Sequence, residues 1–163
     1  MNDLIKIIES CINETFLDED GDRLTIKLRE AGKAKDILNF ELSKGIQLPD
    51  DLKKLLLFSN GMNFLGLRIL SLEEIEFFPH SRILSFHNWE DGDFDCISIN
   101  GDYPEGTILF MFHSEDNLEP VCNNLVEWFK EVILEIKKIG SLRHPLDYSN
   151  KELEGMYKNI SKF

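Results

Sequence analysis

Residues 83–129 combine strand-forming runs with charge of a single sign. The segment holds ten acidic residues and neither lysine nor arginine. It also holds the run TILFMF at 107–112, which is apolar at nearly every position. A strand with apolar side chains on both faces belongs inside a sheet that is covered on both sides. The segment that builds the sheet is therefore predicted to carry most of the chain's negative charge.

This charge imbalance limits the partners that the chain can bind. The formal net charge is −12 over 163 residues, and residues 83–129 hold most of the excess. An acidic surface repels phosphate backbones and anionic membranes, so we expect neither nucleic acid nor membrane as a partner. A basic protein would be steered towards it. The alternative is that the charge serves only solubility.

The length and the cysteines predict one domain in a reducing compartment. A chain of 163 residues buries enough surface for a single core. Cys11, Cys96 and Cys122 are an odd number without close spacing, which predicts buried free thiols. The N-terminus does not resemble a signal peptide, and we find no apolar run long enough to cross a bilayer. We therefore expect a cytoplasmic protein.

Periodicity places helices and strands along the chain. The stripe that begins at Leu4 predicts an N-terminal helix within residues 1–17. Caps and apolar spacing predict further helices over 33–44, 50–58 and 124–139, and a short one after Ser149. Strands are predicted at 24–28, 63–66, 67–70, 81–86, 94–99 and 107–112, with a turn at 89–93.

Several short motifs resemble the SUKH superfamily, which contains Smi/Knr-type cell-wall regulators. The sequence LPDD at 48–51 opens a leucine-rich helix that ends at Asn60-Gly61. LSLEEI at 70–75 and the helix start NLVEWF at 124–129 follow in the order expected of that family. The likeness covers roughly residues 37–132.

This resemblance implies a fold and a role. The fold is α+β: a single domain over 1–163 in which a twisted, mainly antiparallel sheet is flanked by helices. Its core spans about 33–140, with the N-terminal helix at 1–17 and a C-terminal helical extension at 141–163. Many bacterial members of the family that this chain resembles are immunity proteins, which bind and neutralise a polymorphic toxin. Other members of that family look like regulatory scaffolds. The family supplies no general catalytic set.

The acidic segment supplies candidate residues for binding a partner. An aromatic side chain ringed by charge is typical of an interface hot spot, and Trp89 and Tyr103 fit this pattern. The alternative for Trp89 is that its indole folds under the turn and seals the core. The predicted binding residues are Trp89, Glu90, Asp91, Asp93, Asp95, Asp102, Tyr103, Glu105, Glu115 and Asp116.

Enzyme chemistry is the weaker interpretation. The alternating Asp91, Asp93 and Asp95, with His87 and His113 nearby, could form a divalent-metal hydrolase site. This segment does not match a calcium-binding loop, because Cys96 occupies the position that requires glycine. The acidic neighbours of Cys96 should raise its pKa and make it a poor nucleophile. We therefore expect no enzyme activity, no metal and no cofactor.

The sequence thus predicts a non-enzymatic immunity protein. Its acidic surface would dock on the basic face of a toxin, and a nuclease toxin has such a face because it must attract phosphates. One alternative is a regulatory scaffold of the Smi/Knr type, and the other is the metal hydrolase.

Overall fold

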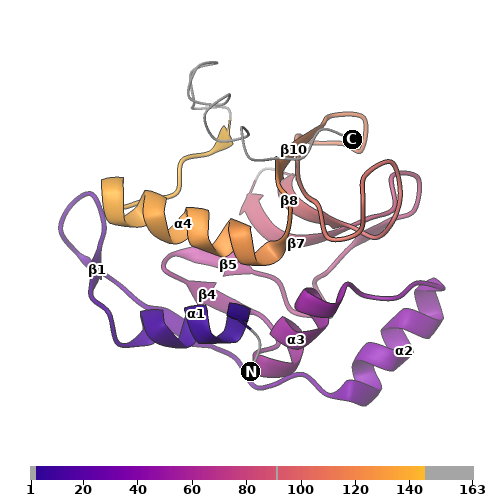
Figure 1. Cartoon of the computed structure of the whole chain (residues 1–163), viewed down its shortest axis with the longest axis horizontal. Helices are drawn as coiled ribbons and strands as arrows, with labels where there is room; N and C mark the ends of the chain where they lie inside the picture. Colours follow the sequence, from indigo (N-terminus) through magenta and orange to yellow (C-terminus); the bar gives the residue numbers. More distant parts are fainter. Residues whose placement is uncertain (1–2, 91, 146–163) are drawn as a thin grey trace.

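An open antiparallel sheet forms the centre of the computed structural model, which describes residues 3–90 and 92–145 (Figure 1). The strand order is β10-β9-β8-β7-β5-β4-β3, and β6 pairs with β7 outside this path. A separate two-stranded ribbon joins β1 to β2. The fold is therefore α+β, as the family resemblance predicted.

The elements have the following bounds. The helices are α1 (Asp3–Ile12), α2 (Ala34–Lys44), α3 (Asp50–Phe58) and α4 (Leu125–Ile139). The strands are β1 (Phe16–Leu17), β2 (Arg23–Leu24), β3 (Ile26–Leu28), β4 (Met62–Phe64), β5 (Leu67–Ile69), β6 (Phe77–Phe78), β7 (Ile83–Glu90), β8 (Asp93–Ser98), β9 (Ile108–Met111) and β10 (Leu118–Cys122).

The helix α4 runs across one face of the sheet, and its sequence explains its ends. The Asn124 side chain accepts a hydrogen bond from the backbone N–H of Glu127 at 2.9 Å. The Glu127 carboxylate accepts one from the N–H of Asn123 at 3.1 Å, which completes a reciprocal cap. Gly140 ends the helix in the left-handed conformation. The helix predicted over 124–139 is confirmed.

The two faces of the sheet are covered differently. Apolar side chains of α1, α3 and α4 form the main core with one face, where the Phe64 and Phe129 ring centroids lie 4.9 Å apart. A second cluster on the other face is built from Ile83, Cys96, Leu109 and Met111, with no helical residue among its described members. Strand β9 is thus buried on both faces, as its apolar run predicted.

The Asn60-Gly61 turn joins α3 to β4 and packs against the segment after β5. Gly61 has a φ of 83°, and an added Cβ would lie 2.8 Å from the Ser71 nitrogen, so only glycine fits. The Asn60 side chain accepts a hydrogen bond from the N–H of Leu72 at 2.7 Å. This part of the family motif therefore serves the fold.

Glu74 connects the segment after β5 to two arginines, and its removal is expected to lower stability near neutral pH. Its carboxylate accepts a hydrogen bond from the Ser71 N–H at 2.9 Å and pairs with Arg68 and Arg29. Burial alone would raise its pKa, but these hydrogen bonds and charges lower the pKa from 4.5 to about 2. We expect Glu74→Gln to cost about 1 kcal/mol at neutral pH, a typical value for a lost cap.

The pH dependence of that cost has a definite sign. The folded-state pKa lies below the unfolded value, so the stabilisation is present above pH 4.5 and is lost as the pH falls towards 2. Urea unfolding of both proteins at neutral pH and at about pH 3 should therefore show a smaller difference at the acidic pH. Glu76→Gln, at an exposed neighbour, is the control. A cost that does not change with pH would contradict this account.

The structure corrects several local predictions. Strand β7 extends through Trp89 and Glu90, so the turn predicted at 89–93 is shorter than expected. Phe16 lies in β1 and not in the first helix. Strands β6 and β10 were not predicted. Pro120 breaks the strand pattern of β10, but β10 is at the edge of the sheet, where a missing N–H is tolerated. The predicted helix after Ser149 lies outside the described residues.

Candidate docking surface

The hairpin of β7 and β8 holds two of the predicted docking residues inside the protein. Asp95 is 1% exposed and Asp93 is 5% exposed. The prediction that both carboxylates lie at the surface is therefore wrong. Asp91 lies outside the described residues, and Glu90 is the last residue of β7.

Asp95 is buried because β7 supplies its hydrogen-bonding partners. His87 Nδ1 lies 2.8 Å from Asp95 Oδ2, and Trp89 Nε1 donates to the same oxygen at 2.9 Å. A register shift in β7 between Ser85 and His87 places His87 directly opposite Asp95. The carboxylate is thus paired on the sheet face that α4 covers, where the His87 and Trp128 ring centroids are 5.3 Å apart.

Asp93 connects the hairpin to two more distant parts of the chain. Its Oδ1 accepts a hydrogen bond from the His113 N–H at 3.1 Å, and His113 Nδ1 lies 3.0 Å from the same oxygen. Its Oδ2 lies 2.9 Å from His144 Nε2. Asp93 therefore fastens both the loop after β9 and the segment after α4 to the sheet.

Trp89 behaves as a structural residue in this arrangement. It is half-buried against the main core, and its ring centroid lies 4.7 Å from that of His87 and 5.2 Å from that of His144. Its indole N–H is already used by Asp95. The geometry matches the interpretation in which the indole seals the core.

Neither a metal centre nor a reactive thiol is apparent in the described part of the chain. No group of three His, Cys, Asp or Glu side chains there is placed to hold a metal ion. Burial, followed by the charges of Asp95, Glu76 and Glu115, raises the pKa of Cys96 well above 9.0. Burial also raises the pKa of Cys122. The prediction of a raised Cys96 pKa is confirmed.

The remaining predicted residues lie on two loops that meet beside the sheet. Asp102 and Glu105, in the loop between β8 and β9, are exposed, and so is Asp116 in the loop between β9 and β10. An added Cβ on Gly101 would lie 2.5 Å from the Ser81 oxygen. The Glu115 carboxylate accepts a hydrogen bond from the Ser81 N–H at 2.9 Å. Both loops therefore pack against the same segment.

Tyr103 lies in the first of these loops and is half-buried. Its ring packs against the second apolar cluster, and its carbonyl oxygen accepts a hydrogen bond from the Ser98 hydroxyl at 2.8 Å. We call the set Asp102, Tyr103, Glu105, Glu115 and Asp116 the acidic loops. Both loops contact Ser81, whereas Asp93 and Asp95 are buried.

The acidic loops are not neutralised by the ion pairs found among the described residues. Lysine and arginine pair with carboxylates elsewhere, as in Lys53–Glu41 at 2.8 Å and Lys137–Glu14 at 3.0 Å. Among the described residues, the ion pairs formed by lysine and arginine do not include Asp102, Glu105, Glu115 or Asp116. Arg82 and Lys130 flank residues 83–129 in the sequence, and both are exposed.

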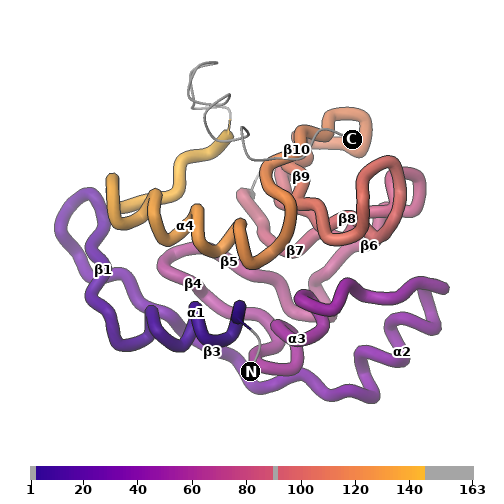
Figure 2. The backbone as a smooth tube through the Cα atoms, viewed as in Figure 1, coloured from indigo at the N-terminus to yellow at the C-terminus, as the bar shows by residue number. Residues whose placement is uncertain are grey.

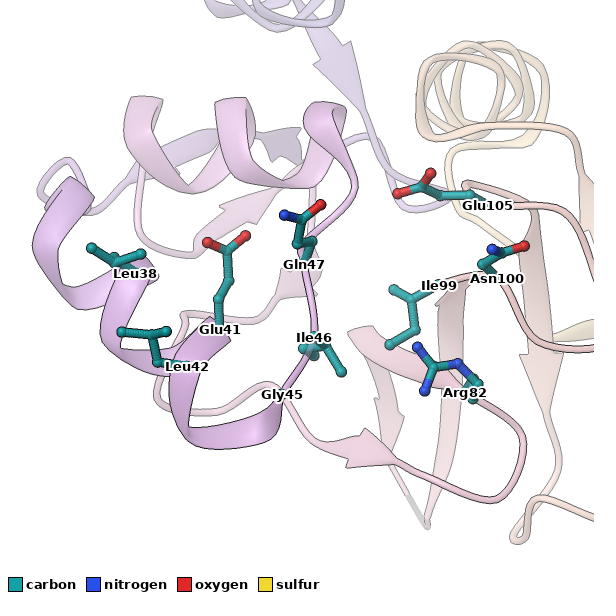
Figure 3. A pocket seen from close by; sticks show the side chains of 10 residues that line it. All are labelled: Leu38, Glu41, Leu42, Gly45, Ile46, Gln47, Arg82, Ile99, Asn100 and Glu105. Atoms are coloured by element: carbon teal, nitrogen blue, oxygen red, sulfur yellow. The ribbon is translucent and has the colours of Figure 1, made fainter.

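A cleft of about 520 Å³ opens next to the acidic loops (Figure 3). One wall is α2 with the chain that follows it, and the other is formed by Arg82, Ile99, Asn100 and Glu105. A second hollow of about 570 Å³ shares Gln47 and Glu105 with it and continues past the start of α3. Sequence reasoning missed this cleft, because its two walls are far apart in the chain.

The structure thus combines exposed carboxylates on two loops with an adjacent cleft in an α+β domain. Residues 31–131 match the model of the SMI1 / KNR4 family (SUKH-1), and the chain belongs to that family. The match agrees with the resemblance drawn from the sequence and is consistent with an immunity-type or Smi/Knr-type interaction domain. No curated protein matched the chain. None of the helices in the described ranges has the length and apolar content to cross a membrane.

Proposed function

We propose that this protein is an immunity protein that neutralises a toxin by docking its acidic loops on a basic face of that toxin. The observation that carries the proposal is the exposure of Asp102, Glu105 and Asp116 without a lysine or arginine partner among the described residues. Charges that are not neutralised internally are free to attract an opposite charge on a second protein.

The mechanism is steric and electrostatic blockade. Carboxylates on two neighbouring loops create a local negative potential, which raises the rate of encounter with a basic protein. A nuclease is the toxin class that fits best, since its active face must attract phosphates. The docked domain would cover that face and keep the substrate out. Charge would mainly set the association rate, while the apolar contact made by Tyr103 would slow dissociation.

We further propose that the protein acts by binding alone and catalyses no reaction. The buried Asp95 and Asp93 are engaged by His87, Trp89, His113 and His144, so these groups serve the fold. The raised pKa values of Cys96 and Cys122 support the same proposal, because a thiol of high pKa is a poor nucleophile.

Neutralising the acidic loops is expected to slow association. The triple variant Asp102→Asn, Glu105→Gln, Asp116→Asn should lower the association rate with the cognate toxin by about tenfold at low salt. The difference should shrink as the ionic strength rises from about 50 mM to about 500 mM. Surface plasmon resonance on the purified toxin domain, inactivated by mutation, measures both effects.

The matched control removes the same number of charges elsewhere. Glu9→Gln, Asp20→Asn and Glu30→Gln are exposed positions on other parts of the surface. If this control slows association as much as the loop variant does, net charge and not the acidic loops attracts the partner. Co-expression then separates the roles: an immunity protein restores growth to cells making the toxin, whereas a scaffold binds a partner without restoring growth.

A further inference from the structure

The cleft beside the acidic loops has walls of unlike chemistry. Figure 3 shows Glu105 and Arg82 on the sheet side, with Gln47 and Ile46 facing them from the chain after α2. Ile46 and Ile99 are buried and provide an apolar floor. Because Glu105 belongs to both the acidic loops and the cleft, a partner docked on the loops would also reach the cleft.

Arg82 is held in position by its backbone. Its φ is 52°, in the left-handed region that residues other than glycine seldom occupy. The opposite loop approaches Arg82 closely, since an added Cβ on Gly101 would lie 3.1 Å from the Arg82 Cβ. Strain of this kind is retained where the surroundings determine it, and it is concentrated at functional sites.

The Arg82 guanidinium is available to a ligand. It extends from the sheet side across the cleft towards Ile46 (Figure 3). The other carboxylate of the cleft wall, Glu41, is already paired with Lys53 at 2.8 Å and accepts a hydrogen bond from the Leu48 N–H. No ion pair of Arg82 occurs among the described residues. The cleft therefore presents one cation that has no carboxylate partner among the described residues.

The helix α2 adds exposed apolar surface at the same place. Leu38 and Leu42 both line the cleft, and they are 54% and 71% exposed. They lie one turn apart, so they share a face of the helix. Ile37 is the one buried residue of α2, and Figure 2 shows the helix at the periphery of the molecule, away from α4. Figure 3 shows these leucines at the α2 end of the cleft, with Ile46 between them and Arg82, so the cleft has an apolar wall followed by a cation.

We propose that the cleft receives a segment of the partner protein that presents an apolar side chain next to a carboxylate. The apolar side chain contacts Leu38, Leu42 and Ile46, and the carboxylate pairs with Arg82. A basic residue on the same segment meets Glu105 at the mouth. This inference rests on the proposed function, because it names the part of the partner that fits beside the acidic loops.

A short peptide tests the proposal without the partner in hand. The probe is Ac-Lys-Leu-Asp-NH2, titrated into the ¹⁵N-labelled full-length protein and followed by amide chemical shifts. Two matched peptides omit one feature each: Ac-Lys-Leu-Asn-NH2 lacks the carboxylate, and Ac-Lys-Gly-Asp-NH2 lacks the apolar side chain. We expect shifts centred on Ile46, Arg82 and Ile99, with each matched peptide binding about tenfold more weakly.

Variants of the protein show whether the chemical-shift changes arise from binding in the cleft. Arg82→Gln should abolish the preference for aspartate over asparagine, whereas Arg23→Gln, an equal charge change on β2, should leave the preference intact. Leu42→Ala should weaken binding of the leucine peptide, and Leu134→Ala, at an exposed leucine of α4, should not. Unchanged melting temperatures of all four variants show that the fold is retained.

Three outcomes would overturn the inference. One is the absence of specific shifts at the highest peptide concentration. Another is shifts that persist unchanged in Arg82→Gln. The third is concentration-dependent self-association of the protein that Leu42→Ala abolishes, which would assign the cleft to a second copy of the chain. None of these outcomes touches the proposed function, which is decided by the charge variants Asp102→Asn, Glu105→Gln and Asp116→Asn.

Discussion

Replacing Asp95 with alanine is expected to lower the free energy of unfolding by about 3–5 kcal/mol, the range for breaking a buried, paired polar contact. Asp95 Oδ2 is the acceptor for Trp89 Nε1 and lies 2.8 Å from His87 Nδ1. Removing the carboxylate leaves both groups without this acceptor at a position closed to water, since Asp95 is 1% exposed. Each unsatisfied group costs about 1–3 kcal/mol. Urea unfolding followed by tryptophan fluorescence measures the change.

Asp116→Ala is the matched control for this variant. Asp116 belongs to the same acidic segment but is exposed, so its replacement should change stability by no more than about 0.5 kcal/mol. Equal effects at the two positions would show that the buried network does not contribute to stability. The pair of variants thus separates acidic residues that hold the fold from those that remain at the surface.

Phe129→Ala is expected to be the second severe substitution, at a cost of about 3–5 kcal/mol. The Phe129 side chain is fully buried, and its ring centroid lies 4.9 Å from that of Phe64 and 5.1 Å from that of Trp128. Its loss opens a cavity where α4 meets the sheet. Thermal and urea unfolding should both report the loss.

Leu134→Ala, on the same helix, is the control for Phe129→Ala. Leu134 is 61% exposed, and alanine has a helix propensity at least as good as that of leucine, so stability should change by less than about 0.5 kcal/mol. A comparable loss of stability at both positions would mean that helix propensity, and not burial, determines the effect of substitutions in α4. These two substitutions therefore test the face of α4 that the periodicity assigned to the core.

The helices and the central strand were predictable because their signals are local. Helix α4 has an apolar stripe, a capping asparagine and a terminal glycine within one short segment, and the structure confirms each of them. Strand β9 has an unbroken apolar run, which fits burial on both faces. Strand β10 was missed because Pro120 is unfavourable in a strand unless the strand lies at an edge, and edge position depends on the whole sheet.

The candidate site was only partly predictable. The sequence pointed to Asp102, Glu105 and Asp116, and the structure places all three at the surface. The sequence pointed equally to Asp93 and Asp95, but both of these residues are buried. All five are acidic residues in one segment, so composition alone could not distinguish them.

The sequence by itself determined the family, the periodic elements and the concentration of carboxylates in residues 83–129, since each depends on residues close together in the chain. Only the tertiary structure decided which carboxylates reach solvent. That choice depends on a register shift that aligns His87 with Asp95 and on His144, which approaches Asp93 from beyond α4. The tertiary structure also formed the cleft, because Arg82 and α2 come together only when the sheet and the helices pack. Contacts between distant residues are fixed by packing, and no local pattern encodes them.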